Sequence, residues 1–499
     1  MSDVIEMLKV DMNQQNDGTG HDRRAAELAE LTATEAADHI KEGSLTAEGY
    51  ATALLRVCEA NGDLKALTWM SQETLLESAR GADLARARGE ALRPLSGIPM
   101  VVKDNIDTVG FPTSAATAAL KDNHPKRNAP IVDALVGRGA YVFAKANMHE
   151  LAGGGTSSNP VFGSVRNPYD RARVAGGSSG GTAAAIAARM APIGLGTDTA
   201  GSVRIPSAFC GTVGLRPTGK LYSAEGIVPL ALDLDTAGPM ARCVADVALM
   251  HAAVTGDALP QPARLDRIRV GISRRYYWEG LDPEIERVTQ EAVERLRQQG
   301  VTFVEVDAGA YLEEADAVFW TFINVGLRDD LRDYLQRHNM ALQAEAVIDA
   351  IASKDTRRLF ALAREADVPA ELVAQSRGAA RTRIAQAYEA MFRAHDISAI
   401  AFPTEALVPP FIKAGGDEFE DEVEVNGKPV NKVEILIRNT RLTCALGAPG
   451  LSLPAGLTVQ GLPVGFELDG LPGNDVALLG LGLSVEAALG RLPAPKLML

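Results

Sequence analysis

Apolar residues recur at helical spacing through the first ninety residues of the chain. The stretches 25–43, 47–62 and 73–90 place alanine and leucine three or four positions apart, with charged residues between them. This pattern is typical of helices that bury one face. Thr32 or Thr34 can cap the first helix, because a threonine side-chain oxygen accepts a hydrogen bond from the first helical turn. The chain therefore begins with a helical region.

From residue 94 onward, short apolar runs alternate with helical patterns. Apolar runs of about four to eight residues between Pro and Gly are typical of buried strands, and longer runs with a 3.6-residue period are typical of helices. The sequence thus predicts strands at 94–103, 141–145, 268–272, 301–306, 398–402, 451–453 and 463–468, and helices at 129–138, 283–299, 432–446 and 475–488. This order favours a mixed α/β architecture with helices on both faces of a sheet.

Two segments depart from the alternation. Residues 1–27 are mostly polar, and we expect them to form a mobile N-terminal tail. Residues 311–395 have an almost wholly helical and charged pattern. No stretch rich in Pro, Gly and Ser divides the remainder, so residues 28–499 are predicted to form a single domain.

The stretch 174–204 contains two glycine-flanked serines, Ser178 and Ser202, on either side of an apolar helical run. Glycine permits backbone conformations and close approaches that a side chain forbids. Loops of this kind bring backbone N–H groups and a small nucleophile close to a ligand. We therefore interpret the stretch as a functional site in which a helix separates the two serines.

Composition narrows the class of protein. The chain has 499 residues, 46% of them hydrophobic, and a net charge of −14 without clustered Lys and Arg, so nucleic acid is not expected as a partner. The four cysteines lie far apart with no C-x-x-C pair, which suggests neither a zinc site nor disulfides and favours the cytoplasm. No apolar run has the length of a signal peptide core or a membrane span. We expect a cytoplasmic protein with no membrane contact.

The glycine-rich stretch fits no nucleotide-binding motif. A P-loop ends in Gly-Lys followed by Ser or Thr, whereas Gly180 and Gly181 lead directly into Thr182. A dinucleotide fingerprint needs a third glycine, and this chain has Thr199 in that place. Both nucleotide hypotheses are rejected.

Two other catalytic motifs match only in part. Residues 177–181 have the form G-x-S-x-G with Ser179 as nucleophile, but that motif follows a buried strand, and here a polar turn precedes it. The late histidine of such a triad would be His395, which lies in the charged helical region. His149 and Glu150 begin an H-E-x-x-H motif whose second histidine is absent, so metal catalysis has no other support.

Serine chemistry without a histidine needs another base. Burial lowers the pKa of a lysine by up to several units, so that a neutral amine can take a proton. Lys103 ends the apolar strand 94–103, at the end of the strand where α/β sheets bind ligands. A second serine can pass a proton between the nucleophile and this amine. Lys103, Ser178 and Ser202 are the one lysine and two serines that such a relay requires.

The chain resembles the amidase signature hydrolases over nearly its whole length after about residue 28. The resemblance rests on G-G-S-S-G-G at 176–181, G-T-D-T-A-G-S-V-R-I-P at 196–206 and the upstream Lys103. Shorter similar pieces are K-A-N-M-H-E at 145–150, G-L-R-P at 214–217, D-T-A-G-P-M at 235–240, G-A-P-G-L-S-L-P at 447–454 and G-L-P-V-G at 461–465. The resemblance implies the amidase signature fold, a large twisted mixed β-sheet covered by helices on both faces.

The same resemblance implies a Ser-cisSer-Lys triad. Ser202 would be the nucleophile, Ser178 the bridging serine on a cis peptide bond, and Lys103 the base. The reaction would pass through an acyl-enzyme on Ser202 and would need no cofactor and no metal. The oxyanion hole would be formed by the backbone N–H groups of Thr199, Ala200, Gly201 and Ser202.

Shorter pieces bear on the substrate. V-R-N-P-Y-D at 165–170, D-T-A-G-P-M-A-R at 235–242 and G-L-P-V-G-F-E-L-D-G at 461–470 are most similar to bacterial arylacetamide-type amidases, such as mandelamide and indoleacetamide hydrolases. This implies hydrolysis of a small primary aryl- or arylalkyl-amide to the acid and ammonia. Hydrazides, carbamoyl or urea-type compounds and peptide-like amides stay open as substrates.

A partner-dependent amidotransferase subunit is a further alternative. That relative usually has Gln where this chain has Thr236, which favours a stand-alone enzyme. The low positive charge of the chain agrees with this interpretation. A homodimer is left open.

Ala200 departs from the family pattern, which usually has glycine there. Its N–H is kept, but its methyl group would narrow the acyl pocket or restrict φ, and we expect it to tune substrate choice. Asp198 and Arg204 are expected to brace the loop by pairing with each other.

The specificity residues are expected in two parts of the chain. Residues 311–395 would form the substrate side of the domain, together with the loop 404–440. Trp320 and Phe411 are candidates within these two parts, although single aromatic residues are more often part of the core than of a pocket.

Overall fold

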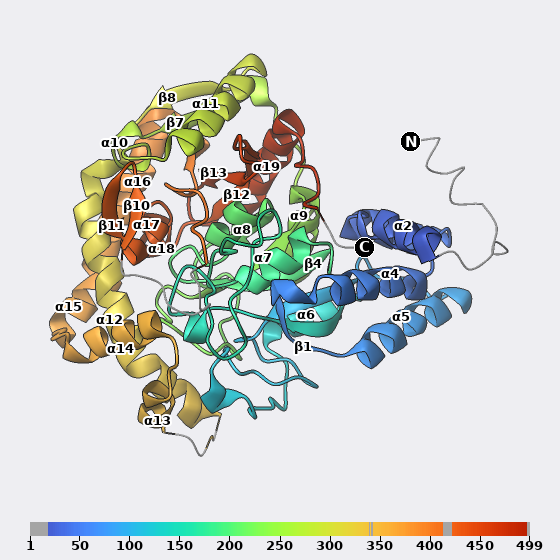
Figure 1. The fold of residues 1–499 in the computed structure, drawn as a ribbon. Coiled ribbons are helices and arrows are strands. Elements are labelled where there is room, and N and C mark those ends of the chain that lie inside the picture. Colours follow the sequence, from blue (N-terminus) through green and yellow to red (C-terminus); the bar gives the residue numbers. More distant parts are fainter. Residues whose placement is uncertain (1–17, 339, 341–342, 413–421, 497–499) are drawn as a thin grey trace.

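The computed structural model describes residues 18–338, 340, 343–412 and 422–496, and Figure 1 shows their arrangement. Within these residues one sheet of eleven strands runs through the molecule. In spatial order its strands are β1 (Leu67–Met70), β3 (Tyr141–Ala146), β2 (Pro99–Lys103), β4 (Ile193–Asp198), β6 (Thr236–Ala241), β5 (Val213–Arg216), β12 (Gly450–Leu457), β13 (Pro463–Asp469), β9 (Ala399–Pro403), β7 (Arg269–Ile272) and β8 (Thr302–Glu305).

The sheet is mixed, as predicted. Strand β2 is parallel to both β3 and β4, whereas β6 is antiparallel to β4 and β5. All residues of β2, β4, β5 and β6 are buried. Strands covered on both faces lack the alternation of polar and apolar residues, which is why β2 appears in the sequence as one apolar run. Its predicted range began too early, because residues 94–97 form a turn and the strand begins at Pro99.

Helices cover both faces of the sheet. Helices α7 (Gly180–Ala187) and α8 (Arg204–Cys210) pack together over the strands that carry the predicted site, and α9 (Val244–Thr255), α11 (Pro283–Gln298) and α19 (Asp475–Leu489) form the opposite layer. Every residue of α7 is buried. A helix that is apolar all round is typical of a position inside the core.

The glycine-rich strand β4 lets α7 approach the sheet. A Cβ atom at Gly194 would lie 2.8 Å from Cγ2 of Thr182, and one at Gly196 would lie 2.8 Å from Oγ of Ser179. Glycine weakens a strand pattern in the sequence, and β4 was not predicted. The two serines are therefore separated by a helix and a strand, where the sequence suggested a helix alone.

The N-terminal helices lie on one side of the molecule (Figure 1). They are α2 (Gly18–Ala29), α3 (Ala33–Glu42), α4 (Ala47–Ala60) and α5 (Gln72–Ala87). Thr32 caps α3 and forms a capping box with Glu35. Of the two predicted caps, Thr32 and Thr34, the structure uses Thr32. Residues 1–17 of the predicted tail lie outside the described residues. Residues 18–27 of that predicted range belong to α2, which begins at Gly18 and buries Ala25.

The region 311–395 is helical, as predicted, and lies on the side opposite the N-terminal helices (Figure 1). Its long helix α12 extends over 26 residues, and a π-helical turn, η6, joins two of the shorter helices. The elements are α12 (Leu312–Arg337), α13 (Ala344–Asp349), α14 (Lys354–Glu365), α15 (Ala370–Gln375), η6 (Ser376–Ala380) and α16 (Arg381–His395).

The helix predicted over 432–446 is interrupted. It consists of α17 (Lys432–Ile437) and α18 (Arg441–Leu446), with a turn between them. In this turn Asn439 Nδ2 donates to the carbonyl of Pro403 at 2.7 Å, and Thr440 Oγ1 donates to the carbonyl of Ala200 at 2.6 Å. These side-chain contacts with distant segments hold the turn between the two helices in place.

Other elements complete the described chain. A hairpin of β10 (Glu422–Val425) and β11 (Lys428–Asn431) lies within the stretch 404–440 that the sequence suggested was a loop. Strands β1, β5 and β6 and helix α9 were not predicted either. The remaining helices are α6 (Pro130–Val136), α10 (Arg274–Tyr277), η1 (Gly62–Leu64), η2 (Ala118–Leu120), η3 (Glu150–Ala152), η4 (Leu265–Arg267) and η5 (Ala308–Tyr311).

Candidate active site

Lys103 stands at the carboxyl end of β2, in the interior of the sheet. Its side chain is fully buried. The Nζ atom lies 2.7 Å from Oγ of Ser178 and 2.7 Å from Oγ1 of Thr197. Burial lowers the pKa of Lys103 to about 7, although the carboxylates of Asp198 and Asp235 oppose this shift. The amine is therefore substantially neutral near pH 7 and can accept a proton.

Ser178 follows a cis peptide bond between Gly177 and Ser178. Its carbonyl accepts hydrogen bonds from the N–H of His149 at 3.1 Å and from the hydroxyl of Ser157 at 3.2 Å. The neighbouring glycine is needed for close packing, because a Cβ atom at Gly177 would lie 2.7 Å from the backbone nitrogen of Thr156. The glycine run thus places Ser178 between a neighbouring loop and Lys103.

Ser202 lies in the loop after β4 and is 7% exposed. The N–H of Ser179 donates to the carbonyl of Ser202 at 3.2 Å. The hydroxyl of Ser179 also donates to the carbonyl of Thr197 at 3.1 Å and accepts from the N–H of Thr197 at 3.2 Å. These bonds join the two serine loops, so the structure brings Lys103, Ser178 and Ser202 into one region.

Asp198 and Arg204 pair as predicted, and the loop from 199 to 203 is held between them. Nε of Arg204 lies 3.0 Å from Oδ2 of Asp198, and a second arginine, Arg216, approaches Oδ1 at 3.1 Å. Arg204 also contacts Glu467 at 2.9 Å. Burial would raise the pKa of Asp198, but the two guanidinium groups hold it below its usual range. This buried network fixes the geometry of the loop.

Three of the four predicted oxyanion-hole N–H groups are free to bind a ligand. Within the described residues the N–H groups of Thr199, Ala200 and Ser202 make no hydrogen bond. Gly201 departs from the prediction, because its N–H donates to Oδ1 of Asp198 at 2.9 Å. A donor already bound to a carboxylate is not available to a developing oxyanion. The sequence could not reveal this, because the bond depends on how the loop turns back over Asp198.

Ala200 lies beside the turn that interrupts the predicted helix 432–446. Its carbonyl accepts the hydroxyl hydrogen of Thr440 at 2.6 Å. A Cβ atom at the next residue, Gly201, would lie 2.2 Å from Oγ1 of Thr440, and Gly201 has φ +118. The predicted specificity stretch 404–440 and its continuation therefore contact the loop that carries Ser202.

Sequence reasoning missed two polar residues near Lys103. Thr197 precedes Asp198 on β4 and places its hydroxyl against Lys103 Nζ. Asp235 accepts the hydroxyl hydrogen of Thr199 at 2.5 Å and the N–H groups of two residues in the preceding turn. Both residues belong to motifs that the sequence displays, but only the folded structure places them close to Lys103.

The two aromatic candidates have clear neighbours outside the serine loops. Trp320 is half-buried in α12 and packs edge-to-face on Phe319 at 5.2 Å between ring centroids. Phe411 is 58% exposed, and the guanidinium of Arg173 lies 3.8 Å from its ring centroid. Their expected role in specificity stays a prediction.

The side chains of His149 and Glu150 both lie within hydrogen-bond distance of Ser353. In the described part of the chain, no group of three or more His, Cys, Asp and Glu side chains is arranged to hold a metal ion. The His149 imidazole lies 3.3 Å from Oγ of Ser353 and 3.4 Å from Oγ1 of Thr156. The H-E pair of the sequence therefore has local hydrogen-bond partners.

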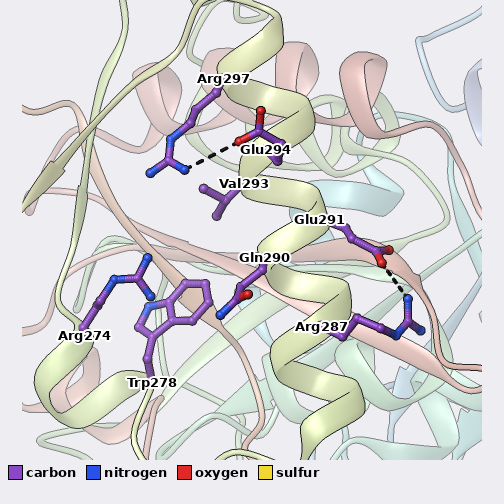
Figure 2. A pocket seen from close by; sticks show the side chains of 8 residues that line it. All are labelled: Arg274, Trp278, Arg287, Gln290, Glu291, Val293, Glu294 and Arg297. Carbon is purple, nitrogen blue, oxygen red and sulfur yellow. Dashed lines mark hydrogen bonds and ion pairs between the residues drawn. The ribbon is translucent and has the colours of Figure 1, made fainter.

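A surface pocket of about 410 Å³ lies between α10 and α11. Figure 2 shows that Arg287 turns to Glu291 and Arg297 turns to Glu294. Because these guanidinium groups already have carboxylate partners, the pocket gives no independent sign of a ligand. Its lining residues, none of them a predicted site residue, are Arg274, Trp278, Arg287, Gln290, Glu291, Val293, Glu294 and Arg297.

None of the helices in the described ranges is both long and apolar enough to cross a membrane.

A buried lysine beside a serine loop, joined to a second serine loop with free N–H groups, is typical of hydrolases that use serine without histidine. The comparisons with known proteins agree with this class.

The family model described as Amidase matches residues 50–479. The chain is 34% identical to mandelamide hydrolase of Pseudomonas putida over 484 residues, covering 94% of this chain and 93% of that protein. It is 38% identical to indoleacetamide hydrolase of Agrobacterium vitis over 453 residues, covering 89% and 94%. The X-ray structure of native peptide amidase from Stenotrophomonas maltophilia superposes with a TM-score of 0.78 at 27% identity, covering 94% and 99%.

The chain therefore belongs to the amidase family, and it is an enzyme that hydrolyses an amide to the acid and ammonia. The predicted family, the predicted mixed α/β fold and the predicted class of reaction are confirmed.

Proposed function

We propose that this amidase hydrolyses a small primary aryl- or arylalkyl-amide through an acyl-enzyme on Ser202. The observation that carries the proposal is the 2.7 Å contact between Nζ of Lys103 and Oγ of Ser178 in a fully buried site. The substrate class is supported by similarity to mandelamide hydrolase and indoleacetamide hydrolase. Both names denote hydrolases of an amide that carries an aryl group.

In the first step Oγ of Ser202 attacks the carbonyl carbon of the amide. Ser178 takes the proton of Ser202 and passes its own proton to the neutral amine of Lys103. Because the pKa of Lys103 is about 7, its amine is available as a base near neutral pH. Thr197 supports this amine through a hydroxyl group at 2.7 Å.

The tetrahedral intermediate carries a negative charge on the former carbonyl oxygen. The N–H groups of Thr199, Ala200 and Ser202 are the donors for this oxyanion, and Gly201 has no part in it because Asp198 occupies its N–H. Loss of one such donor typically lowers the rate about a hundredfold or more. The Asp198 network keeps the donors in place before the substrate arrives.

In the second step the C–N bond breaks and the leaving nitrogen takes the proton from Lys103 through Ser178. Ammonia leaves, and the acyl group remains as an ester of Ser202. A water molecule then attacks this ester, again with Ser178 and Lys103 as the proton relay. The acid is released, and the cycle requires no cofactor.

A peptide-like amide is the second candidate substrate. The similarity to the peptide amidase of Stenotrophomonas maltophilia supports it. Hydrazides, carbamoyl or urea-type compounds and the role of a partner-dependent amidotransferase subunit stay as alternatives that the same assays separate.

The proposal is tested by a panel of arylacetamides, peptide amides, hydrazides and ureas, assayed for release of ammonia or hydrazine. We expect the arylacetamides to have the highest kcat/KM and Ser202→Ala to abolish turnover. Turnover retained in Ser202→Ala would contradict the nucleophile assignment. Lack of turnover by the pure wild-type chain, restored by a co-purified partner, would favour the amidotransferase alternative.

We further propose that the methyl group of Ala200 tunes the choice of substrate. Ala200 is itself one of the proposed oxyanion donors, and its carbonyl accepts the hydroxyl hydrogen of Thr440 at 2.6 Å. We expect Ala200→Gly to change the ratio of kcat/KM for bulky and small amides by roughly tenfold or more, since a single methylene in a pocket is worth about 1–3 kcal/mol. An unchanged ratio would contradict this role.

A cytoplasmic location is also part of the proposal. All four cysteines are free and buried, which suits a reducing compartment. Residues 28–499 are proposed to act as one domain. A homodimer is tested by the molecular mass of the enzyme in solution.

A further inference from the structure

His149 and Glu150 lie between the Ser178 loop and the helical region 311–395, and the mechanism above uses neither side chain. Both residues follow strand β3 and are fully buried. One side of this pair contacts the backbone of Ser178, and the other contacts the start of α14. The pair therefore connects the catalytic loop with the helices expected on the substrate side.

The backbone of His149 holds Ser178. Its N–H donates to the carbonyl of Ser178 at 3.1 Å. The other donor to that carbonyl is the hydroxyl of Ser157 at 3.2 Å, and Oγ of Ser157 in turn accepts the N–H of Gly180 at 3.0 Å. A displacement of His149 thus moves the peptide group of Ser178, whose side chain must stay at 2.7 Å from Lys103.

The side chains of the pair hold the first turn of α14. Nε2 of His149 lies 3.3 Å from Oγ of Ser353, which is the N-cap residue of α14. Oε2 of Glu150 accepts the N–H groups of Ala352 at 3.0 Å and Ser353 at 2.7 Å. A carboxylate at this place satisfies donors that a helix start leaves open. The hydroxyl of Thr356 in α14 also donates to the carbonyl of Glu150 at 3.3 Å. The position of α14 is therefore tied to His149 and Glu150 by four hydrogen bonds.

Tight packing makes this connection rigid. A Cβ atom at Gly154 would lie 2.4 Å from Cε1 of His149, and one at Gly153 would lie 2.6 Å from Cγ2 of Thr356 in α14. The glycine loop is thus pressed between the imidazole and the helix. Close-packed contacts of this kind transmit a shift from one element to the next.

A largely buried ion pair also holds the first turn of α14. Nζ of Lys432, the first residue of α17, lies 2.6 Å from Oδ2 of Asp355.

Burial lowers the pKa of His149 to about 4. The charge of Asp355 opposes this shift, and the charges of Lys432 and Lys103 add to it. The imidazole is neutral near pH 7 and offers one donor and one acceptor nitrogen. It therefore adds no positive charge beside Lys103.

We propose that His149 is a positioning residue. It couples the position of α14 to the position of Ser178 and so aligns Ser178 with Lys103. Through the contact between its imidazole and Ser353, a shift of the helical region moves His149 and, with it, the Ser178 backbone in the proton relay. This inference rests on the proposed function, in which Ser178 passes the proton. The rate of the chemical step then depends on the contact between His149 and Ser353, which does not touch the substrate.

The test compares His149→Ala, His149→Gln and Ser353→Ala in the full chain, with an arylacetamide as substrate. We expect His149→Ala to lower kcat roughly 10- to 100-fold, since a misplacement of about 1 Å at a catalytic group costs about a hundredfold. KM should change less than about twofold, because the contact adds nothing to substrate binding. His149→Gln should recover most of kcat, because its amide can bond Ser353.

Two further variants make the result specific. Ser353→Ala should lower kcat several fold, and adding it to His149→Ala should cause no further loss, because both remove the same contact. The exposed His124 provides the control, and His124→Ala should retain the kcat of the wild type. Ser353→Ala and His149→Gln keep the test intact if His149→Ala does not fold.

Several results would overturn the inference. Wild-type kcat in the folded His149→Ala variant, an equal loss in His149→Gln, multiplied losses in the double variant, or an effect confined to KM would each contradict it. If the wild type hydrolyses amides and Ser202→Ala does not, these results count against the positioning role alone. Turnover by Ser202→Ala would overturn the proposed function as well.

Discussion

Two buried lysines, Lys103 and Lys145, stand side by side in the sheet and differ in what they can do. They occupy the parallel neighbours β2 and β3, with Lys103 opposite Ala146 and Lys145 opposite Val102. Both side chains are fully buried. Burial lowers the pKa of Lys103 to about 7 and that of Lys145 to about 8. Burial and lowered pKa are therefore shared, and neither explains a difference in role.

The partners of the two amines differ in kind. Nζ of Lys145 donates to the carbonyls of Ile106 at 2.7 Å and Pro112 at 3.1 Å, with Asp104 at 3.9 Å. Carbonyl oxygens only accept, so they favour an amine that gives hydrogen bonds. Nζ of Lys103 has two hydroxyl groups at 2.7 Å. A hydroxyl can also donate, and Lys145 has one such partner as well, Oγ1 of Thr113 at 3.3 Å. The Ser178 hydroxyl beside Lys103 differs because it stands in the loop that is joined to the Ser202 loop, so Lys103 is the amine placed to receive a proton from the proposed nucleophile.

The largest expected effect is on catalysis by Lys103. We expect Lys103→Ala to lower kcat/KM by about 10⁴-fold or more, because members of a catalytic relay act as a unit. Ser178→Ala should lose a similar amount. The measurement is ammonia release from an arylacetamide, with a thermal melt to show that each variant is folded. A loss of only a few fold in Lys103→Ala would contradict the assigned base.

Lys145 should matter to stability instead. Lys145→Met leaves two buried carbonyls and Asp104 without their cation, and we expect it to reduce the free energy of unfolding by about 3 kcal/mol. Denaturation in urea measures this loss. The folded fraction should keep kcat within a few fold of the wild type. If Lys145→Met were as inactive as Lys103→Ala, the division between the two lysines would be wrong.

The pH dependence of kcat/KM also separates the roles of Lys103 and Lys145. A protonated Lys103 cannot take a proton, so kcat/KM should fall about tenfold per pH unit below pH 7 and level off above it. The sign follows from the pKa of about 7 for this amine. The Lys145→Met variant should show the same midpoint. A midpoint that moves in Lys145→Met would show that Lys145 takes part in the titration.

The smallest expected effect concerns the hydroxyl beside each amine. Oγ1 of Thr197 lies 2.7 Å from Lys103 Nζ, and Oγ1 of Thr113 lies 3.3 Å from Lys145 Nζ. Thr197→Val should lower kcat roughly fivefold, since one lost hydrogen bond is worth about 1 kcal/mol. Thr113→Val is the matched control and should leave kcat unchanged. Steady-state kinetics of the two variants measure this difference. Equal losses of kcat in Thr197→Val and Thr113→Val would contradict a specific role for the Thr197 hydroxyl.

Residues that stand in short motifs could be recognised from the sequence. Lys103 ends an apolar run, and Ser178 and Ser202 lie in glycine-rich motifs, so local patterns indicated all three as candidates, and the structure brings them into one region. The capping of α3 by Thr32 is likewise a local signal. In each case the information lies within a few residues of the predicted position.

Features that depend on distant contacts were not predictable. The side chain of Asn439, in the turn between α17 and α18, donates to the carbonyl of the distant Pro403. The Asp198 carboxylate that accepts the N–H of Gly201 is itself held by Arg216 from another strand. Strand β4 contains glycines that disfavour a strand locally, yet the approach of α7 requires them. Tertiary packing outweighed local propensity at each of these places.

The proton relay from Ser202 through Ser178 to Lys103 is tested most directly by trapping the acyl-enzyme. An activated anilide of an arylacetic acid is mixed with the wild type, Lys103→Ala and Lys145→Met, quenched within milliseconds, and mapped by peptide mass. We predict an acyl adduct on Ser202 in the wild type and in Lys145→Met, and no adduct in Lys103→Ala on that timescale. An adduct on another residue, or one that forms at the wild-type rate in Lys103→Ala, would contradict the relay.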